Sequence, residues 1–318
     1  MKRQHRCCGS TSRRRSQVDA KDDTSAWATV PARAITALRK ILGKSDYRAY
    51  AGAYSGGANA VYWLRILRHN NDGTVRVHNI IDRARREIDD DDHDIEPDFL
   101  YPLLRGREVK KWATHPDRDS RFLIVQDTQK RRGFDAKKIK GWPRTLGYLE
   151  RYENVLRERA AFKRYFRATD PFYSMFNIAE YTFAPFKVVW AEQGNFGAAV
   201  VGTVRDQPIV PDHKIMMLPF DDEDEAHYVW AVTNSSPFRF AVDAYAINIQ
   251  QDPHVFQNVR VPKYEAANPV HRRLAQLSRR AHEIVHEGEL GELSKIEAEI
   301  DRGAAKVWGL SERELKEI

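Results

Sequence analysis

The segment 61–79 reads VYWLRILRHNNDGTVRVHN, and its pattern decides the class of fold. Apolar, aromatic and β-branched residues dominate 61–67 and recur through 74–79, which is typical of β-strands. The intervening tetrapeptide 70–73, NNDG, is typical of the turn of a β-hairpin. A second pair of strands is expected at 186–190 and 198–204, on either side of the turn residues Gly194 and Asn195.

Helices are expected next to these strands. The stretch 143–165 has no internal proline and carries apolar residues at helical spacing, and 225–232 indicates another helix. Near the C-terminus, Asn268 followed by Pro269 is typical of a helix start, and Ser311 with Glu314 has the spacing of a capping box. The sequence therefore predicts an α+β fold, with a mixed-sheet domain followed by a C-terminal helical segment.

The expected domain limits follow from composition. Residues 1–24 begin with a basic, acid-free stretch and are expected to form a disordered basic tail, unless they are spurious upstream sequence. Residues 25–265 are expected to form the α+β domain, and 266–318 the helices that pack on it. The two cysteines, Cys7 and Cys8, are adjacent and cannot join distant segments, which favours a reducing, cytoplasmic location. No apolar run is long enough to cross a membrane.

Charge is unevenly distributed along the 318 residues, whose net charge is +7. Residues 87–98 hold eight acidic residues and no Lys or Arg, whereas 101–167 hold nineteen Lys or Arg against eight Asp or Glu. Within the second segment, 101–112 reads YPLLRGREVKKW, four cations beside aromatic rings. Basic residues interleaved with aromatic residues favour a nucleic-acid interface. The alternative is a solvated basic face over core aromatic residues.

Two patterns indicate metal-dependent hydrolysis instead. His282, Glu283 and His286 have the spacing of a helical zinc site with a general base, but no convincing third ligand follows them. Asp98 followed by Glu108 and Lys110 resembles the carboxylates and lysine of magnesium-dependent nucleases. The intervening 97–106 contains two prolines and a glycine, which favours a short helix or turn over the strand that such a site requires.

A glycine-rich stretch, 52–59, reads GAYSGGAN. It lacks the Gly-x-Gly-x-x-Gly spacing of a dinucleotide-binding loop. The glycines are expected to permit a tight turn or a close approach of two backbones.

Eight segments in a fixed order carry a resemblance to a known family. The chain resembles the C-terminal, target-recognition half of adenine-specific DNA methyltransferases, including the type IIG restriction–modification enzymes that fuse such a half to a nuclease. The segments are YRAYAGAYSGGANAVYWLRIL (47–67), IEPDFLYPLLRGREVKKW (95–112), WPRTLGYLERYENVLRER (142–159), YSMFNIAEYTFAPFKVVW (173–190), VPDHKIMMLP (210–219), EAHYVWAVTNSSP (225–237), NPVHRRLAQLSRRAHEI (268–284) and IDRGAAKVWGLSERE (300–314).

The resemblance implies a module that recognises a sequence in double-stranded DNA. The family's S-adenosylmethionine loop and its Asn-Pro-Pro-Tyr loop have no counterpart in the sequence. The chain is therefore expected to bind no cofactor and to make no methyl transfer by itself. S-adenosylmethionine is expected on a methyltransferase catalytic subunit or a missing domain.

The candidate DNA-binding residues follow from side-chain chemistry. Lys and Arg would neutralise phosphates, Arg could also bond guanine, Asn and Gln could bond adenine, and Trp112 could stack or insert between bases. The candidates are Asn59, Arg105, Arg107, Lys110, Lys111, Trp112, Gln126, Gln129, Arg131, Arg132, Lys137 and Lys138.

Overall fold

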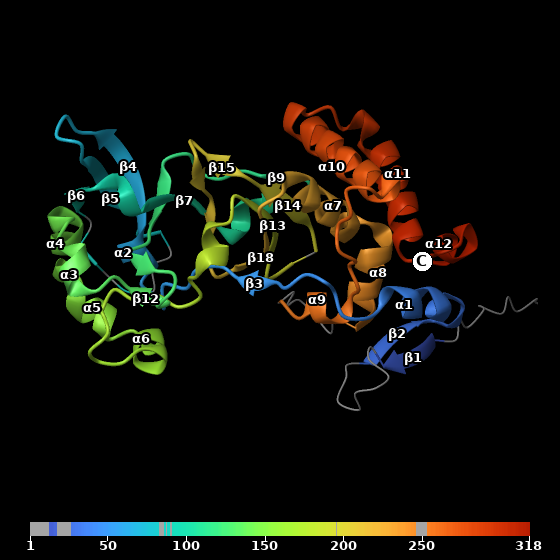
Figure 1. Ribbon diagram of the computed structural model, residues 1–318, viewed down its shortest axis with the longest axis horizontal. Coiled ribbons are helices and arrows are strands. Elements are labelled where there is room, and N and C mark those ends of the chain that lie inside the picture. The colour runs from blue at the N-terminus through green and yellow to red at the C-terminus, as the bar shows by residue number, and fades with distance from the viewer. Residues whose placement is uncertain are drawn as a thin grey trace, which may run out of the picture.

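The computed structural model describes residues 13–17, 27–82, 86, 88–89, 91–194, 196–245 and 253–318. Helices and strands are mixed throughout these residues, as an α+β fold requires. Two hydrophobic cores divide them into two lobes. The lobes lie side by side and give the molecule an elongated outline (Figure 1).

The first lobe contains a six-stranded sheet and the short helices α2 to α6. The sheet order β17-β7-β10-β4-β5-β6 corresponds to Val210–Pro211, Leu100–Leu104, Ser120–Leu123, Trp63–His69, Val75–Asn79 and Asp92–Ile95. The helices are Asn59–Tyr62, Ala136–Ile139, Pro143–Arg151, Glu153–Arg157 and Ala160–Tyr165. Strands β4 and β5 pair antiparallel across the turn at 70–73, so the expected hairpin is confirmed.

The second lobe contains a four-stranded sheet and the remaining helices. The sheet order β14-β13-β18-β3 corresponds to Ala198–Val201, Phe186–Ala191, Ile215–Phe220 and Tyr50–Ala51. The helices are α1 Ile35–Ile41, α7 Glu223–Asn234, α8 Ser236–Tyr245, α9 Val255–Asn258, α10 Pro269–Glu287, α11 Leu293–Val307 and α12 Glu312–Glu317. The expected pairing of 186–190 with 198–204 is confirmed by β13 and β14.

Four two-stranded ribbons complete the described strands. They are β1–β2 (Arg13–Gln17 with Trp27–Pro31), β8–β9 (Val109–Lys110 with Ala113–Thr114), β11–β12 (Gln126–Asp127 with Arg132–Gly133) and β15–β16 (Thr203–Val204 with Gln207–Pro208).

The expected disordered tail, 1–24, lies mostly outside the described residues, as do both cysteines. Within that range, Arg13–Gln17 form a strand that pairs with β2.

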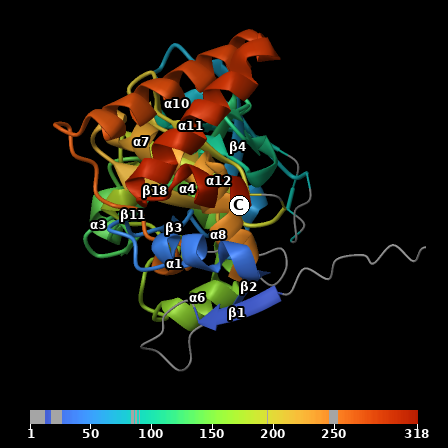
Figure 2. The same cartoon turned by 90° about the vertical axis from the view of Figure 1, so that its right-hand side faces the viewer.

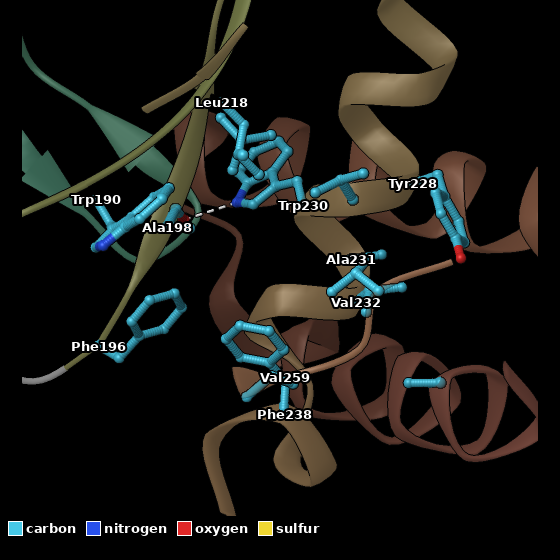
Figure 3. Packing of buried hydrophobic residues seen from close by; sticks show 14 of the residues in the cluster. Trp190, Phe196, Ala198, Leu218, Tyr228, Trp230, Ala231, Val232, Phe238 and Val259 are labelled. Atoms are coloured by element: carbon cyan, nitrogen blue, oxygen red, sulfur yellow. Dashed lines mark hydrogen bonds between the residues drawn. The ribbon is translucent and has the colours of Figure 1, made fainter. Parts of the chain in front are cut away.

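The core of the second lobe joins its sheet to the C-terminal helices. Trp190 on β13 and Trp230 on α7 are both buried, and the Trp230 indole donates to the carbonyl of Ala198, 2.6 Å away (Figure 3). Helix α10 lies beside α7 and buries apolar residues such as Leu274 in the same core (Figure 2). Asn268 caps α10 as expected, because its side chain accepts from two backbone amides of the first turn.

Two expectations of local structure are wrong. The stretch 97–106, expected as a short helix or turn, begins with the 3₁₀ helix η2, Pro97–Phe99, but continues as β7, which lies inside the six-stranded sheet. A strand tolerates a proline where no hydrogen bond from the proline nitrogen is needed for pairing. Here β17 pairs with β7 only at Leu103 and Leu104, beyond Pro102. The helix expected over 143–165 is instead three short helices, α4, α5 and α6, with breaks at Tyr152 and at 158–159.

The glycine-rich stretch lies where the chain crosses from one lobe to the other. The Gly52 amide donates to the carbonyl of Ile215, and the Ala53 amide donates to that of Pro211, both at 2.9 Å. A Cβ on Gly52 would lie 2.2 Å from the carbonyl oxygen of Asp212. Only glycine fits this approach, so the expectation of close backbone contact is confirmed.

Among the described residues, no helix is long and apolar enough to cross a membrane.

Candidate nucleic-acid interface

An open cleft of about 800 Å³ lies between the two lobes. Its first-lobe wall includes Asn59 and Trp63, and its second-lobe wall includes residues 191–194 and Arg239. The segment 105–111 runs along it, because β7 ends there and the chain turns through the 3₁₀ helix η3, Gly106–Glu108, into β8. We call this site the central cleft.

Five of the twelve candidate residues come together in the central cleft. They are Asn59, Arg105, Arg107, Lys110 and Lys111. Lys214 and Arg239 also line it, although neither belongs to a run of charge in the sequence. Patterns of local composition cannot reveal such residues, because the β17–β18 turn and α8 reach the cleft only in the folded chain.

The cations of the central cleft differ in how firmly they are held. Arg107 pairs with Asp82 at 3.3 Å, and Lys214 pairs with Glu192 at 2.7 Å, in pairs that include exposed side chains. Such surface pairs stabilise a fold little and can exchange for a phosphate. Within the described part of the chain, Lys110 and Arg239 have no ion-pair partner. The cleft therefore offers several cations to an anionic ligand.

Three candidates are buried, and this burial argues against direct contact with DNA. Trp112 is 1% exposed and donates from its indole nitrogen to Glu297, so it does not present a ring for stacking. Gln126 uses its amide on the backbone of Tyr173 and Met175. Arg105 is held against Glu108. The polar groups of these side chains are used within the fold instead.

The remaining candidates lie in the first lobe, away from the central cleft. Gln129 and Arg131 occupy the turn between β11 and β12, where Arg131 has a left-handed φ of 53°. Arg132 is bound to Asp135 and Asp170. Lys137 and Lys138 are exposed on α3. Figure 1 shows β12 and α3 on the side of this lobe opposite the β4–β5 hairpin. The basic segment is therefore divided between faces rather than gathered on a single one.

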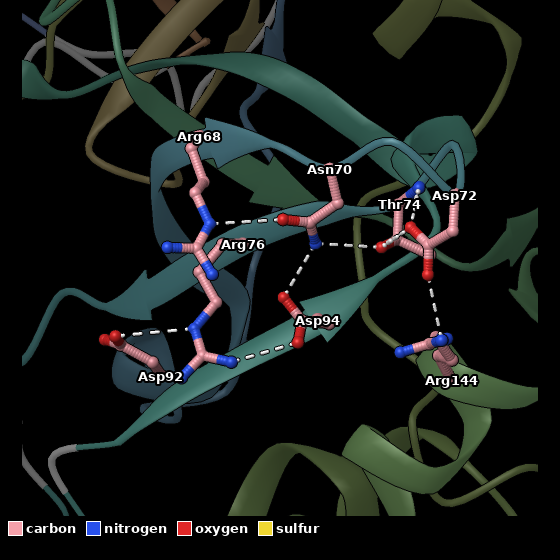
Figure 4. Close-up of polar contacts among 8 residues, drawn as sticks. All are labelled: Arg68, Asn70, Asp72, Thr74, Arg76, Asp92, Asp94 and Arg144. Atoms are coloured by element: carbon pink, nitrogen blue, oxygen red, sulfur yellow. Dashed lines mark hydrogen bonds and ion pairs between the residues drawn. The ribbon is translucent and has the colours of Figure 1, made fainter.

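The acidic segment 87–98 neutralises part of this basic charge inside the first lobe, because its Asp89 and Asp91 pair with Arg151 of α4. On β6, Asp92 and Asp94 both pair with Arg76 of β5, and Arg144 of α4 pairs with Asp72 of the hairpin turn (Figure 4). The carboxyl groups of Asp92 and Asp94 are held below their usual pKa, mainly by side-chain hydrogen bonds from His78 and Asn70 respectively. The net charge of a segment therefore overstates the number of cations available to a ligand.

Neither metal-dependent alternative is favoured. His282 donates from Nδ1 to the carbonyl of Trp112, and no group of three potential ligands is found among the described residues. Asp98 precedes the five residues of β7 and Glu108 follows them. A strand of that length spans roughly 17 Å, so the two carboxylates cannot share one ion. Glu108 is also held by the buried Arg105.

Asp212 is a buried carboxyl group on the wall of the central cleft. Burial raises its pKa to about 6, and the negative charge of Glu108 adds to this effect. Among the described residues, the carboxyl group accepts one hydrogen bond, which the backbone amide of Lys214 donates over 2.6 Å. Because the folded state binds this proton more tightly than the unfolded chain, the free energy of unfolding falls as pH rises through 4 to 6.

Replacing Asp212 by Asn is therefore expected to stabilise the protein at neutral pH. An amide oxygen can still accept from Lys214, while the cost of burying a charge disappears. We expect a gain of about 2 kcal/mol at pH 8 that vanishes near pH 4. Urea unfolding followed at both pH values measures it, and an equal effect at pH 4 and pH 8 would contradict the assignment.

Two comparisons relate the chain to the enzymes of restriction–modification systems. In sequence, it is 30% identical over 145 residues to Type II methyltransferase M.NspV of Nostoc sp., a match covering 45% of this chain and 29% of that protein. In fold, it is similar to the Type IIL restriction–modification enzyme MmeI, whose structure was solved in complex with DNA. That match has a TM-score of 0.51 and 10% identity, and covers 83% of this chain and 33% of MmeI.

The chain thus spans about a third or less of the length of either protein. No protein-family model matches it.

Proposed function

We propose that the chain is the DNA target-recognition part of a restriction–modification methyltransferase. The observation that carries this proposal is the convergence of Asn59, the cations of 105–111, Lys214 and Arg239 on the central cleft. Sequence similarity to a type II methyltransferase and a fold shared with a DNA-bound restriction–modification enzyme support it. In this role, Lys110, Lys214 and Arg239 contact phosphates and set the register of the duplex.

Specificity would come from side chains that reach the base edges. Arg107 is exposed at the cleft and has the donor geometry for a guanine, and Asn59 could bond an adenine. The Asn59 side-chain oxygen accepts from the Ser55 hydroxyl, which fixes the orientation of its amide. We propose that the target base is an adenine, and that S-adenosylmethionine and methyl transfer belong to a catalytic subunit or domain of the type IIG kind, outside this chain.

Binding to duplex DNA at several salt concentrations tests this function. Each phosphate contact contributes about 0.9 to the slope of log K against log salt, so three or four cleft cations predict a slope near −3. Fluorescence anisotropy with a labelled duplex measures the slope, and salt-independent affinity would contradict a phosphate-led interface. Calorimetry with S-adenosylmethionine tests the second part, which saturable binding to this chain alone would contradict.

A further inference from the structure

A second cavity, of about 850 Å³, borders the same β8–β9 ribbon as the central cleft. Lys110 of this ribbon lines the cleft, whereas Thr114 and the following His115 line the second cavity. We call the second cavity the arginine groove, because four arginines from separate elements line it. They are Arg68 of β4, Arg118 of the β9–β10 loop, Arg121 of β10 and Arg205 of the β15–β16 turn.

Arg121 indicates that the groove is built for an anion. Its guanidinium is partly buried, and its hydrogen bonds in the described structure go to the carbonyls of Arg118 and Ser120, at 2.7 and 2.9 Å. Burial lowers the pKa of Arg121; the charge of Asp119 opposes this shift, and that of Arg205 adds to it. A partly desolvated cation beside a second cation is unfavourable unless an anion joins them.

Arg205 stands at the tip of a tight hairpin. Arg205 and Asp206 both have left-handed backbones, with φ of 51° and 62°, as the two-residue turn between β15 and β16 requires. Glycine or asparagine usually fills such positions, because other side chains are strained there. Non-glycine residues in this conformation cluster at binding sites. Here the strain holds an exposed guanidinium at the rim of the groove.

The nearby carboxylates leave this positive charge largely uncompensated. Asp117 and Asp119 also line the groove: Asp117 pairs with Arg65 at 3.1 Å, and the exposed Asp119 offsets only part of the charge of four arginines. Within the described residues, Arg118 and Arg205 have no ion-pair partner, and Arg68 bonds the neutral side chain of Asn70. Guanidinium groups match the geometry of phosphate oxygens better than ammonium groups do. Four of them around one groove fit a polyphosphate.

We propose that the arginine groove binds backbone phosphates of the same DNA duplex that the central cleft holds. This inference rests on the proposed function and extends it. Both cavities are open, and both border the short β8–β9 ribbon. One duplex crossing the ribbon would contact Lys110 on one side and Arg118 with Arg205 on the other. His286, at the end of α10, closes the groove from the second lobe.

The test uses the full chain carrying Arg118→Gln and Arg205→Asn. Asparagine tolerates the left-handed backbone at 205, so the hairpin is kept while the charge is removed. With both sites in contact, the salt slope of the unmodified chain is expected near −5, and this variant should bring it back to near −3, the contribution of the central cleft, with about tenfold weaker binding near 0.1 M salt. The matched control, Arg313→Gln with Lys316→Gln, removes the same charge on α12, which lies away from β4, β9 and β15 (Figure 1), and should change neither.

A second readout does not depend on substitutions. Phenylglyoxal labelling of the unmodified chain, followed by peptide mass spectrometry, is expected to show Arg118 and Arg205 protected by duplex DNA and Arg313 unprotected. Unchanged slope and unprotected groove arginines, with DNA still bound through Lys110, would overturn the arginine groove alone. Absence of any duplex binding by the unmodified chain would overturn the proposed function together with this inference.

Discussion

Replacing Arg159 by methionine is expected to lower the free energy of unfolding by about 4 kcal/mol, the largest single effect on stability that we predict. Arg159 is 1% exposed and lies between α5 and α6. Its guanidinium donates to the carbonyls of Leu156, Ser55, Phe172 and Ser174, at distances from 2.6 to 2.9 Å. Methionine fills a similar volume but leaves four carbonyl groups without this donor.

These contacts join three parts of the first lobe that are distant in sequence. Ser55 belongs to the glycine-rich stretch, and a Cβ on the neighbouring Gly56 would lie 3.3 Å from Cδ of Arg159. The buried cation therefore holds the 52–59 stretch against 172–174. Loss of Arg159 is expected to loosen the first-lobe wall of the central cleft as well as to destabilise the core.

Urea unfolding of Arg159→Met beside Arg164→Met measures this effect. Arg164 lies on α6, the helix that follows Arg159, and its exposed guanidinium lies over the ring of Tyr165, so its replacement should cost less than about 0.5 kcal/mol. Arg159→Lys should fall between the two, since one ammonium cannot reach four carbonyls. Equal losses for Arg159→Met and Arg164→Met would show that the hydrogen bonds contribute little.

Arg159 also shows which features of the fold could be predicted from sequence. The β4–β5 hairpin and the caps of α10 and α12 depend on neighbouring residues, so short patterns reveal them. The role of Arg159 depends on carbonyls from three separate segments, and no pattern within 143–165 indicates it. The same reasoning explains β7. Its proline disfavours a strand locally, but pairing with β10 and β17 outweighs that preference.

The candidate interface divides in the same way. The four cations of 101–112 could be recognised from the sequence because they lie close together in it. They form one wall of the central cleft. The same segment also included Trp112, which packs on Trp230 in the core of the second lobe, and Arg105, which is held by Glu108. Lys214, Arg239 and Arg205 were missed, since each is a single cation in its own segment. Local charge therefore finds part of a surface that tertiary packing completes.

Reversing the charge of Arg107 and Lys110 together is expected to weaken duplex binding about a hundredfold at about 0.1 M salt. Both side chains are exposed on the central cleft, and Lys110 has no ion-pair partner in the described structure. Glutamate at both positions removes two cations and places two anions against the phosphates. The folded state should be little affected, because only the exposed pair of Arg107 with Asp82 is lost.

A matched variant decides between the two faces that carry the candidate residues. Lys137→Glu with Lys138→Glu makes the same change of charge on α3, away from the central cleft. If the cleft holds the duplex, anisotropy should show the large loss only for the Arg107 and Lys110 variant, while both variants keep the melting temperature of the parent. A larger loss from α3 would instead move the interface to the face formed by α3 and the β11–β12 turn, because long-range repulsion is screened beyond about 10 Å at 0.1 M salt.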